Sequence, residues 1–469
     1  MLHPDRLLPA EPGTRDIARR LYDASRTLPL VCPHGHYNPA VLAANRWPAD
    51  AASQLVASDH YLLRLLYSHG VPLESLGATP ADQVSGEVDG RAVWRELARH
   101  YHLFRGTPSK LWLDHTLSEV VGVADPLTPE TADGVYDALS ARLDEEAFRP
   151  RSFLDRCGVQ FLATTDGALD ALESHTALRT SDWDGRVVPT FRPDDVIDPD
   201  RPGFRDRVVM LAELTGADTS TWGGYLEALR IRRGCFVAAG ATATDHGHPS
   251  ALTCDLSVGE AADLFGRVIG GNPRPGDAEC FRGQMLVEMA AMSMDDGLVL
   301  QLHTGSWRNH NPALAARFGP DMGADIPTRA DYVHALKPLL DRFGNEPGLT
   351  VVLYTLDEST YGRELAPLAG HYPVLRLGPP WWFYDSPEGM RRYYRQVTET
   401  AGFANTVGFN DDARSLLSIP ARHDVARRVN AGYLAELVAE HRLTEDEAAD
   451  LAVDLAHRLA AETFMRQGW

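Results

Sequence analysis

The fold is indicated first by a short apolar run that ends in two histidines, Leu30-Val31-Cys32-Pro33-His34-Gly35-His36. The apolar residues predict a buried strand. Residues two apart on a strand point the same way, so both imidazoles can face one side of the strand's end. Two neutral imidazoles placed in this way form half of a divalent-metal site. An isolated His-x-His pair is often a plain surface feature, but its position after an apolar run favours function.

Seven further apolar runs follow, and several also end in polar or ionisable residues. They cover residues 159–166, 186–192, 238–246, 298–303, 349–354, 374–378 and 406–412. Helical patterns lie between most of them, among them 258–270, 328–343, 387–401 and 422–441. Eight strands alternating with helices predict an α/β fold of the (β/α)₈ barrel type. An open doubly wound sheet is the alternative, but no Gly-x-Gly-x-x-Gly element follows the first strand to support it.

One interval breaks this alternation. About 120 residues separate the first strand from the second, which is far beyond an ordinary strand-to-helix connection. Helical patterns cover 92–104 and 128–148, and Asp59 is a candidate N-cap for a helix that ends before Gly70. We therefore expect a helical insertion over the carboxyl-terminal mouth of the barrel, where loops build active sites. The chain divides into an N-terminal segment with the first strand (1–38), the insertion (39–155), the rest of the barrel (156–420) and C-terminal helices (421–469).

Composition excludes several classes of function. The 469 residues include 65 acidic and 45 basic side chains, a formal net charge of −20, which disfavours nucleic acid as a partner. A pocket in an acidic protein can still hold arginines for a small anion. No run approaches 18 apolar residues, and the N-terminus lacks the layout of a signal peptide. The five cysteines form no Cys-x-x-Cys pair, so we expect reduced thiols in a cytoplasmic protein.

Two further strand ends carry histidines. His303 ends the fifth run and precedes the polar stretch 304–311, which favours function. The alternative is a core histidine that bonds a backbone carbonyl. After the fourth run, Asp245, His246 and His248 resemble metal ligands, but the intervening Gly247 suits a loop equally well.

The eighth run ends in two aspartates and an arginine. Asp411 or Asp412 could complete a metal site or act as a base, and Arg414 could bind an anion. Alternatively, one of the aspartates caps the following helix. Both interpretations can hold, because only one aspartate is needed as a cap.

Histidines on strands one and five with an aspartate on strand eight are the ligand layout of the amidohydrolase superfamily. Within it, the chain closely resembles the uronate isomerase (glucuronate isomerase) family over nearly its whole length. The motifs occur in order and are His34-Gly35-His36 with Asn38-Pro39, Asp59-His60-Tyr61, Thr164-Thr165-Asp166, Pro189-Thr190-Phe191-Arg192-Pro193-Asp194, Asp245-His246-Gly247, Gln301-Leu302-His303-Thr304-Gly305 with Arg308-Asn309-His310-Asn311, Trp381-Trp382-Phe383 and Gly408-Phe409-Asn410-Asp411-Asp412-Ala413-Arg414-Ser415. The resemblance implies a distorted TIM barrel of the metal-dependent hydrolase type with a helical insertion after strand one.

The resemblance also implies an activity: conversion of D-glucuronate to D-fructuronate and of D-galacturonate to D-tagaturonate. A proton moves from C2 to C1 of the open-chain sugar acid through an enediol. The implied metal ligands are His34, His36 and Asp412, with His303 as a further ligand or substrate contact. The implied catalytic residues are Asp412 and Tyr61 as the acid/base pair, with His60 and Arg414, and the implied substrate contacts are Arg192, His303, Trp381 and Arg308.

The resemblance implies one divalent cation, expected to be zinc, because the sixth run ends in Tyr354-Thr355 without the histidine that hydrolytic relatives place there. We expect the metal to be catalytic or structural, and the protein to form a homo-oligomer that binds neither nucleic acid nor membrane.

Competing interpretations keep most of these residues but change their purpose. A related metal-dependent hydrolase or decarboxylase would use the same ligands, and a non-catalytic sugar-acid-binding protein would need no base beside them. Trp381 and Trp382 can be plain core aromatics. Arg192 can pair with Asp194 or Asp195 in a weak surface interaction.

Overall fold

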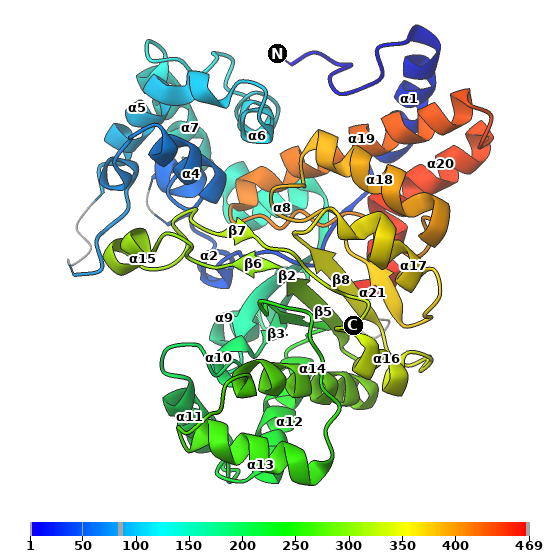
Figure 1. Ribbon diagram of the computed structural model, residues 1–469. Coiled ribbons are helices and arrows are strands. Elements are labelled where there is room, and N and C mark those ends of the chain that lie inside the picture. The colour runs from blue at the N-terminus through cyan, green and yellow to red at the C-terminus, as the bar shows by residue number, and fades with distance from the viewer. Residues whose placement is uncertain (1, 49, 83–87, 466–469) are drawn as a thin grey trace.

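The computed structural model describes residues 2–48, 50–82 and 88–465. A curled sheet of parallel strands occupies its centre, with helices around it (Figure 1). The sheet contains seven strands in the order β1 (Leu30–Cys32), β2 (Val159–Gly167), β3 (Val187–Arg192), β4 (Ala243–His246), β5 (Val299–Thr304), β8 (Val351–Thr355) and β9 (Leu375–Leu377). Every residue of β4, β5 and β8 is buried, as expected for parallel strands covered on both faces. The predicted α/β barrel class is confirmed.

The eighth predicted strand, 406–412, is where the sheet differs from a regular barrel. Thr406 forms an isolated bridge with Leu377, and the segment is otherwise irregular. Gly408 and Asp412 have φ of 74° and 43°, and such left-handed backbone interrupts a strand. The two edges of the sheet approach each other here, because the amide of His36 donates a hydrogen bond to the carbonyl of Ala413 at 3.0 Å.

Other predicted boundaries also shift. The first strand ends at Cys32, so His34 and His36 lie in the loop beyond it; Pro33 has no amide to continue the ladder. The fourth strand begins at Ala243, because residues up to Ala238 belong to a helix. The helix expected over 328–343 begins only at Lys337, since Pro338 is tolerated in a first turn but not in a helix interior.

The interval between β1 and β2 is helical in the described residues, as predicted. Its helices are α2 (Pro39–Ala44), α3 (Ala51–Leu55), α4 (His60–Ser68), α5 (Gly90–His100), α6 (Pro108–His115), α7 (Ala132–Asp144) and α8 (Pro150–Cys157). Asp59 caps α4 by accepting hydrogen bonds from the amides of Tyr61 and Leu62 at 2.8 and 3.0 Å. Trp94 of α5 belongs to one hydrophobic cluster with Leu30 of β1, so the inserted helices pack against the barrel's first strand.

The remaining helices follow the strands or close the chain. They are α9 (Glu173–Arg179), α10 (Asp194–Ile197), α11 (Phe204–Thr215), α12 (Trp222–Ala238), α13 (Val258–Ile269), α14 (Asp277–Asp296), α15 (Pro312–Phe318), α16 (Lys337–Phe343), α17 (Ala366–Ala369), α18 (Pro387–Ala401), α19 (Ile419–Ala439), α20 (Glu445–Val453) and α21 (Leu459–Phe464). The N-terminal α1 (Pro12–Ser25) packs beside α19 and α20 (Figure 1). Among the described residues, no helix is both long and apolar enough to cross a membrane.

A short antiparallel pair lies outside the main sheet. It joins β6 (Ser306–Trp307) to β7 (Ile326–Pro327), with α15 in the connection between them. This pair follows β5 directly, so its connection extends from the carboxyl end of a barrel strand. It thus adds a wall to the same mouth that the helical insertion borders (Figure 1). The predicted division of the chain at residues 38, 155 and 420 stays a prediction.

Candidate active site

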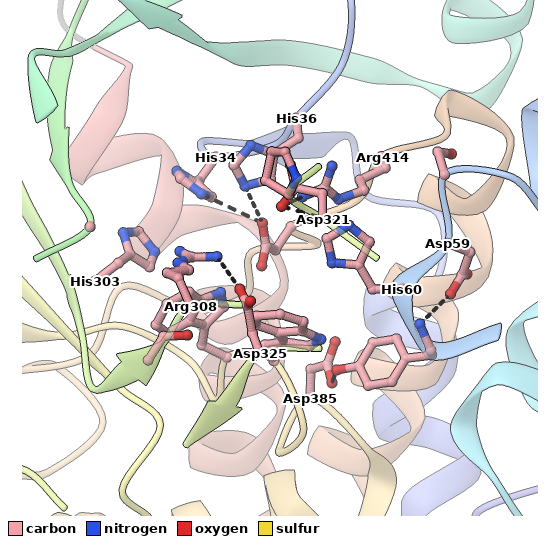
Figure 2. Close-up of a pocket in the computed structure, with 18 of the residues that line it drawn as sticks. His34, His36, Asp59, His60, His303, Arg308, Asp321, Asp325, Asp385 and Arg414 are labelled. Atoms are coloured by element: carbon pink, nitrogen blue, oxygen red, sulfur yellow. Dashed lines mark hydrogen bonds and ion pairs between the residues drawn. The ribbon is translucent and has the colours of Figure 1, made fainter. Parts of the chain in front are cut away.

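A cavity of about 1000 Å³ opens at the carboxyl ends of the strands. The structure brings all ten site residues predicted from the sequence to its wall: His34, His36, His60, Tyr61, Arg192, His303, Arg308, Trp381, Asp412 and Arg414. Arg192 and His303 lie at the ends of β3 and β5, and His60 and Tyr61 lie in α4 of the insertion. The others lie in segments that follow β1, β6 and β9, and Figure 2 shows many of the ten residues directed toward one space. Parallel strands end at one edge, which is why residues so distant in sequence meet here.

The predicted metal ligands form a compact group. Nε2 of His34 lies 3.5 Å from Oδ1 of Asp412, and Nε2 of His36 lies 3.4 Å from the same oxygen. Burial lowers the pKa of His34 and holds that of His36 well below its usual value. Both imidazoles are therefore neutral at pH 7, which is the form that binds metals.

Asp412 has the features of a ligand or a base. Burial raises the pKa of its carboxyl to about 6, and its buried Oδ1 has no hydrogen-bond partner among the described residues. A buried polar atom in this state needs a ligand or a water. An unpartnered carboxylate oxygen between two neutral imidazoles fits a divalent cation.

Asp411 points the other way, into the protein. It accepts hydrogen bonds from the hydroxyl of Tyr37 and, at 3.1 Å, from the amide of Ala413. Burial alone would raise the pKa of Asp411, but the hydrogen bond from His423 keeps it below its usual value. The prediction that one of the two aspartates caps the following helix is wrong. Helix α19 begins after Ser418 without a side-chain cap, because Asp411 points into the protein and Asp412 faces the cavity.

His303 is oriented by a carboxylate. Its Nδ1 lies 2.6 Å from Oδ1 of Asp245, so the alternative that it bonds a backbone carbonyl is wrong. The ring stacks on Tyr354 with centroids 3.9 Å apart. Its Nε2 is buried without a hydrogen-bond partner in the described structure. A carboxylate on one ring nitrogen fixes the other as an acceptor or ligand.

Arg192 is half-buried rather than exposed on the surface. Its side chain is 17% exposed, and its Nε donates to Oδ2 of Asp194 at 2.9 Å. One of its terminal nitrogens lies 3.2 Å from Oδ2 of Asp245. The predicted alternative was correct about the partner Asp194 but wrong about the surface location. Arg192 therefore links Asp194 to the Asp245–His303 pair at the wall of the cavity.

Two arginines face the cavity from opposite sides (Figure 2). Arg308 donates to Oδ2 of Asp325 at 2.9 Å, which fixes it on the β6–β7 connection. Arg414 has a looser contact, 3.6 Å from Oδ1 of Asp321, and Nε2 of His60 lies 3.9 Å from that same oxygen. Burial lowers the pKa of His60 to about 4, so its imidazole is neutral at pH 7.

Tyr61 is held by Asp385, which is in turn held by Arg422, and neither of these two residues was predicted from the sequence. Its hydroxyl donates to Oδ1 of Asp385 at 2.6 Å and accepts from the amide of Phe383 at 2.6 Å. Arg422 donates to Oδ2 of Asp385 at 2.9 Å, and both residues line the cavity. The nearest signal in the sequence was the motif Trp381-Trp382-Phe383, which ends two residues before Asp385.

The two tryptophans are buried, and they also line the cavity. Trp381 meets His303 edge to face with ring centroids 4.8 Å apart. Trp382 stacks on Phe383 at 4.9 Å and lies 5.5 Å from His60. Each tryptophan therefore packs in the core and also forms part of the cavity wall.

Other groups in the described residues could also hold a metal. Asp194, His246 and His248 are buried together, but Arg192 and Arg201 already neutralise Asp194 at 2.9 and 3.1 Å. Cys32, Asp411 and His423 are already joined by hydrogen bonds. The remaining group, His34, Asp245 and His303, shares its two histidines with the cavity wall. The group with His34, His36 and Asp412 combines neutral imidazoles, an unpartnered carboxylate oxygen and access to the cavity.

The barrel, its inserted helices and this histidine–aspartate group define an enzyme of the metal-dependent hydrolase fold type. A solved structure of a putative metal-dependent hydrolase from Lactobacillus casei has this fold, with a TM-score of 0.54 and 14% identity over 95% of this chain and 97% of its own.

The chain belongs to the glucuronate isomerase family, whose sequence profile matches residues 13–464. A uronate isomerase from Rhizorhabdus wittichii is 59% identical over 99% of this chain and 98% of its own length. The crystal structure of glucuronate isomerase from Caulobacter crescentus has a TM-score of 0.98, with 52% identity over 100% of this chain and 98% of its own. Uronate isomerase from Thermotoga maritima has a TM-score of 0.91 and 28% identity, covering 99% of both chains. The predicted activity class, an aldose–ketose isomerase acting on uronates, is confirmed.

Proposed function

We propose that this chain interconverts D-glucuronate with D-fructuronate, and D-galacturonate with D-tagaturonate, in the cavity of Figure 2. One observation carries the proposal: the same cavity holds Arg414, whose nearest carboxylate is 3.6 Å away, and two groups able to move protons, Tyr61 and Asp412. A uronate has a fixed negative charge at one end and a reacting aldehyde at the other, so it needs both.

The reaction requires a group that removes the C2 proton and a second that moves a proton between the two oxygens. We assign Tyr61 and Asp412 to these tasks as a pair. With no cation bound, burial raises the pKa of Asp412 to about 6, so its carboxylate is a stronger base than an ordinary aspartate and still ionises at pH 7. His60, whose imidazole is neutral, would donate a hydrogen bond to an oxygen where negative charge develops.

Arg414 is the preferred anchor for the substrate carboxylate. Its nearest carboxylate, Asp321, is 3.6 Å away, whereas Arg308 and Arg192 are engaged at 2.9 Å by Asp325 and Asp194. A guanidinium with free donors can bind a carboxylate through two parallel hydrogen bonds. Arg192, Arg308 and Trp381 would then hold the rest of the sugar acid.

His34, His36 and Asp412 would hold one divalent cation, and His303 could add Nε2 as a further ligand or contact the substrate. Two imidazoles and a carboxylate are a donor set typical of zinc, so we propose zinc. When bound, the cation supplies positive charge that stabilises negative substrate oxygens. His36→Asn should lower the metal content of the purified protein, measured by elemental analysis. Unchanged metal stoichiometry in this variant would rule out the assigned ligands.

The five cysteines are free, which supports our proposal that the enzyme works in the reducing cytoplasm. We also propose a homo-oligomer, which light scattering of the purified protein would test. A monomer at working concentration would contradict it.

The activity itself is tested by incubating purified protein with each uronate in D₂O. The proposal predicts that the ketose forms and that solvent deuterium enters the sugar without cleavage of any carbon–carbon bond. A decarboxylase would release carbon dioxide, and a binding protein would leave the sugar unchanged. Repeating the assay after chelation, with and without added zinc, separates a catalytic from a structural metal.

A further inference from the structure

The hydroxyl of Tyr61 has both of its hydrogen-bonding roles occupied. It donates to Oδ1 of Asp385 at 2.6 Å and accepts from the amide of Phe383 at 2.6 Å. Burial, reinforced by Asp385, raises the pKa of Tyr61 well above its usual value. A tyrosine in this state is neutral at pH 7, so it can accept a proton only if its own proton leaves at the same time.

Asp385 is placed to receive that proton. Its side chain and that of Arg422 are each 10% exposed, and Arg422 donates to Oδ2 at 2.9 Å. Arg422 is itself fixed by the carbonyl of Asp411 at 3.2 Å and by the ring of Trp112, 3.9 Å away. One oxygen of Asp385 is thus used for charge balance, and the other faces Tyr61.

We propose, building on the proposed function, that Asp385 is a positioning residue that takes the Tyr61 proton during turnover. As a substrate proton forms a new bond to the tyrosine oxygen, the original O–H bond of Tyr61 breaks and a bond to Oδ1 of Asp385 forms. One proton moves from the substrate to Asp385, and no electrons are exchanged. The amide of Phe383 stabilises negative charge on the tyrosine oxygen during the transfer. The reverse sequence returns the proton to the product.

The surrounding charges are arranged for this role. Asp59, the cap of α4, and Asp412, from the segment after β9, act electrostatically on Arg422 of α19. Arg422, and Arg64 of α4, are in turn coupled electrostatically to Tyr61. In the described structure, the hydrogen-bond partners of the Tyr61 hydroxyl are Asp385 and the amide of Phe383. Asp385 is therefore the acceptor that the geometry offers.

The main test is Asp385→Asn, which keeps the size of the side chain but cannot accept the proton. The kcat for D-glucuronate should fall on the order of 10²-fold or more, while KM and metal content change little. The pH profile adds a readout that lost structure would not move. Without Asp385 only the Tyr61 phenolate can act, so kcat of the variant should rise roughly tenfold per pH unit between about pH 7 and 9, whereas the wild-type value should stay flat over that range. Asp385→Glu should recover part of the activity.

The chain offers a matched control in the helical insertion. There Asp114 accepts from the hydroxyl of Tyr101 and from Nζ of Lys110, both at 2.8 Å, and none of the three lines the cavity. Asp114→Asn removes the same kind of tyrosine partner and should leave kcat and its pH profile unchanged. Should Asp385→Asn fail to fold, Asp385→Asn combined with Arg422→Gln removes both charges and should show the same loss.

A double-mutant cycle completes the test. If Asp385 acts through Tyr61, then Asp385→Asn should cost no further activity in a Tyr61→Phe background. Three results would each overturn the inference without affecting the proposed isomerase activity. They are losses of activity that multiply in the double variant, a wild-type pH profile at a lower rate in Asp385→Asn, and full activity in Asp385→Asn. Absence of uronate turnover by the wild-type protein would instead overturn the proposed function, and this inference with it.

Discussion

Asp411 and Asp412 are neighbours in the chain, but they lie in two regions with opposite chemistry. Behind the cavity, Asp411 accepts hydrogen bonds from Tyr37 and His423, and its pKa is lowered. At the mouth, Asp412 has an unpartnered Oδ1 beside His34, and its pKa is raised to about 6. Folding satisfies the first carboxylate completely and leaves the second to a ligand. The difference shows that two aspartates adjacent in sequence can serve different purposes, one in packing and one at the cavity.

Of the substitutions that test this comparison, a change at Asp412 should have the largest effect, and the effect should be on catalysis. Asp412→Asn removes the basicity and a good metal ligand while keeping the shape of the side chain, so kcat should fall on the order of 10²–10⁴-fold. Exchange of the C2 hydrogen of glucuronate with solvent, followed by NMR, should disappear with it. A variant that exchanges at the wild-type rate would show that Asp412 is neither a base nor a required ligand.

The same substitution one residue earlier should act on stability. Asp411→Asn weakens hydrogen bonds to a buried charge, which should lower the free energy of unfolding by about 2–3 kcal/mol at pH 7. Because the folded pKa of Asp411 is lowered, its contribution is fully present above the unfolded value near 3.8 and is lost progressively as the pH falls from there through the lower folded value. Urea unfolding at pH 7 and pH 3.5 should therefore show a gap between wild type and variant that narrows in acid. A gap independent of pH would contradict this assignment.

Substitution of Arg414 tests whether the residues at the mouth of the cavity bind the carboxylate of the substrate. Arg414→Lys keeps the charge but loses the paired donors, and should lower kcat/KM for uronates by about 10–30-fold, or about 1.4–2 kcal/mol. The matched control is Arg232→Lys, since Arg232 bonds the carbonyls of Ala168 and Asp170 and does not line the cavity. Equal effects of the two changes on kcat/KM would argue against an anchor at Arg414.

The smallest expected effect is on the free energy of unfolding when Asp412 is substituted, and its sign should be opposite to that of the Asp411 substitution. A folded pKa of about 6 against 3.8 unfolded means that ionised Asp412 costs stability above pH 6, a cost that vanishes as the pH falls below 3.8. In chelator-treated protein, Asp412→Asn should therefore gain about 1 kcal/mol at pH 8, less than the full shift because buried charges relax. The gain should disappear near pH 4. A loss of stability at pH 8 would show that Asp412 is already satisfied without a ligand.

Much of the cavity could be predicted from the sequence, because strand ends are local signals. An apolar run followed by His34 and His36, or by His303, is visible in a few residues, and the fold brings such ends to one edge. The capping of α4 by Asp59 is equally local, and it fixes the start of the helix that carries His60 and Tyr61. Family resemblance then supplied the roles of residues such as Arg308 and Trp381.

What the sequence could not predict depends on contacts across the fold. Asp385 meets Tyr61 from 324 positions away, and Arg422 reaches Asp385 from the start of α19. No spacing rule connects these three side chains, and Arg422 looked like an ordinary helical residue. The irregularity of segment 406–412 was not predicted for another reason. Its apolar residues fit a strand, but the positive φ of Gly408 and Asp412 interrupts the strand, and an apolar pattern does not encode it.

The barrel also has a seam. Its two edges, β1 and β9, are joined through residues 406–413, where His36 donates a single backbone hydrogen bond to Ala413 and no full ladder forms. Proteins open most easily where few hydrogen bonds must break. The assigned metal ligands lie on both sides of this seam, with His34 and His36 on one edge and Asp412 on the other. A cation held by these three ligands would link the two edges of the barrel, so that loss of the cation and separation of the edges would be coupled.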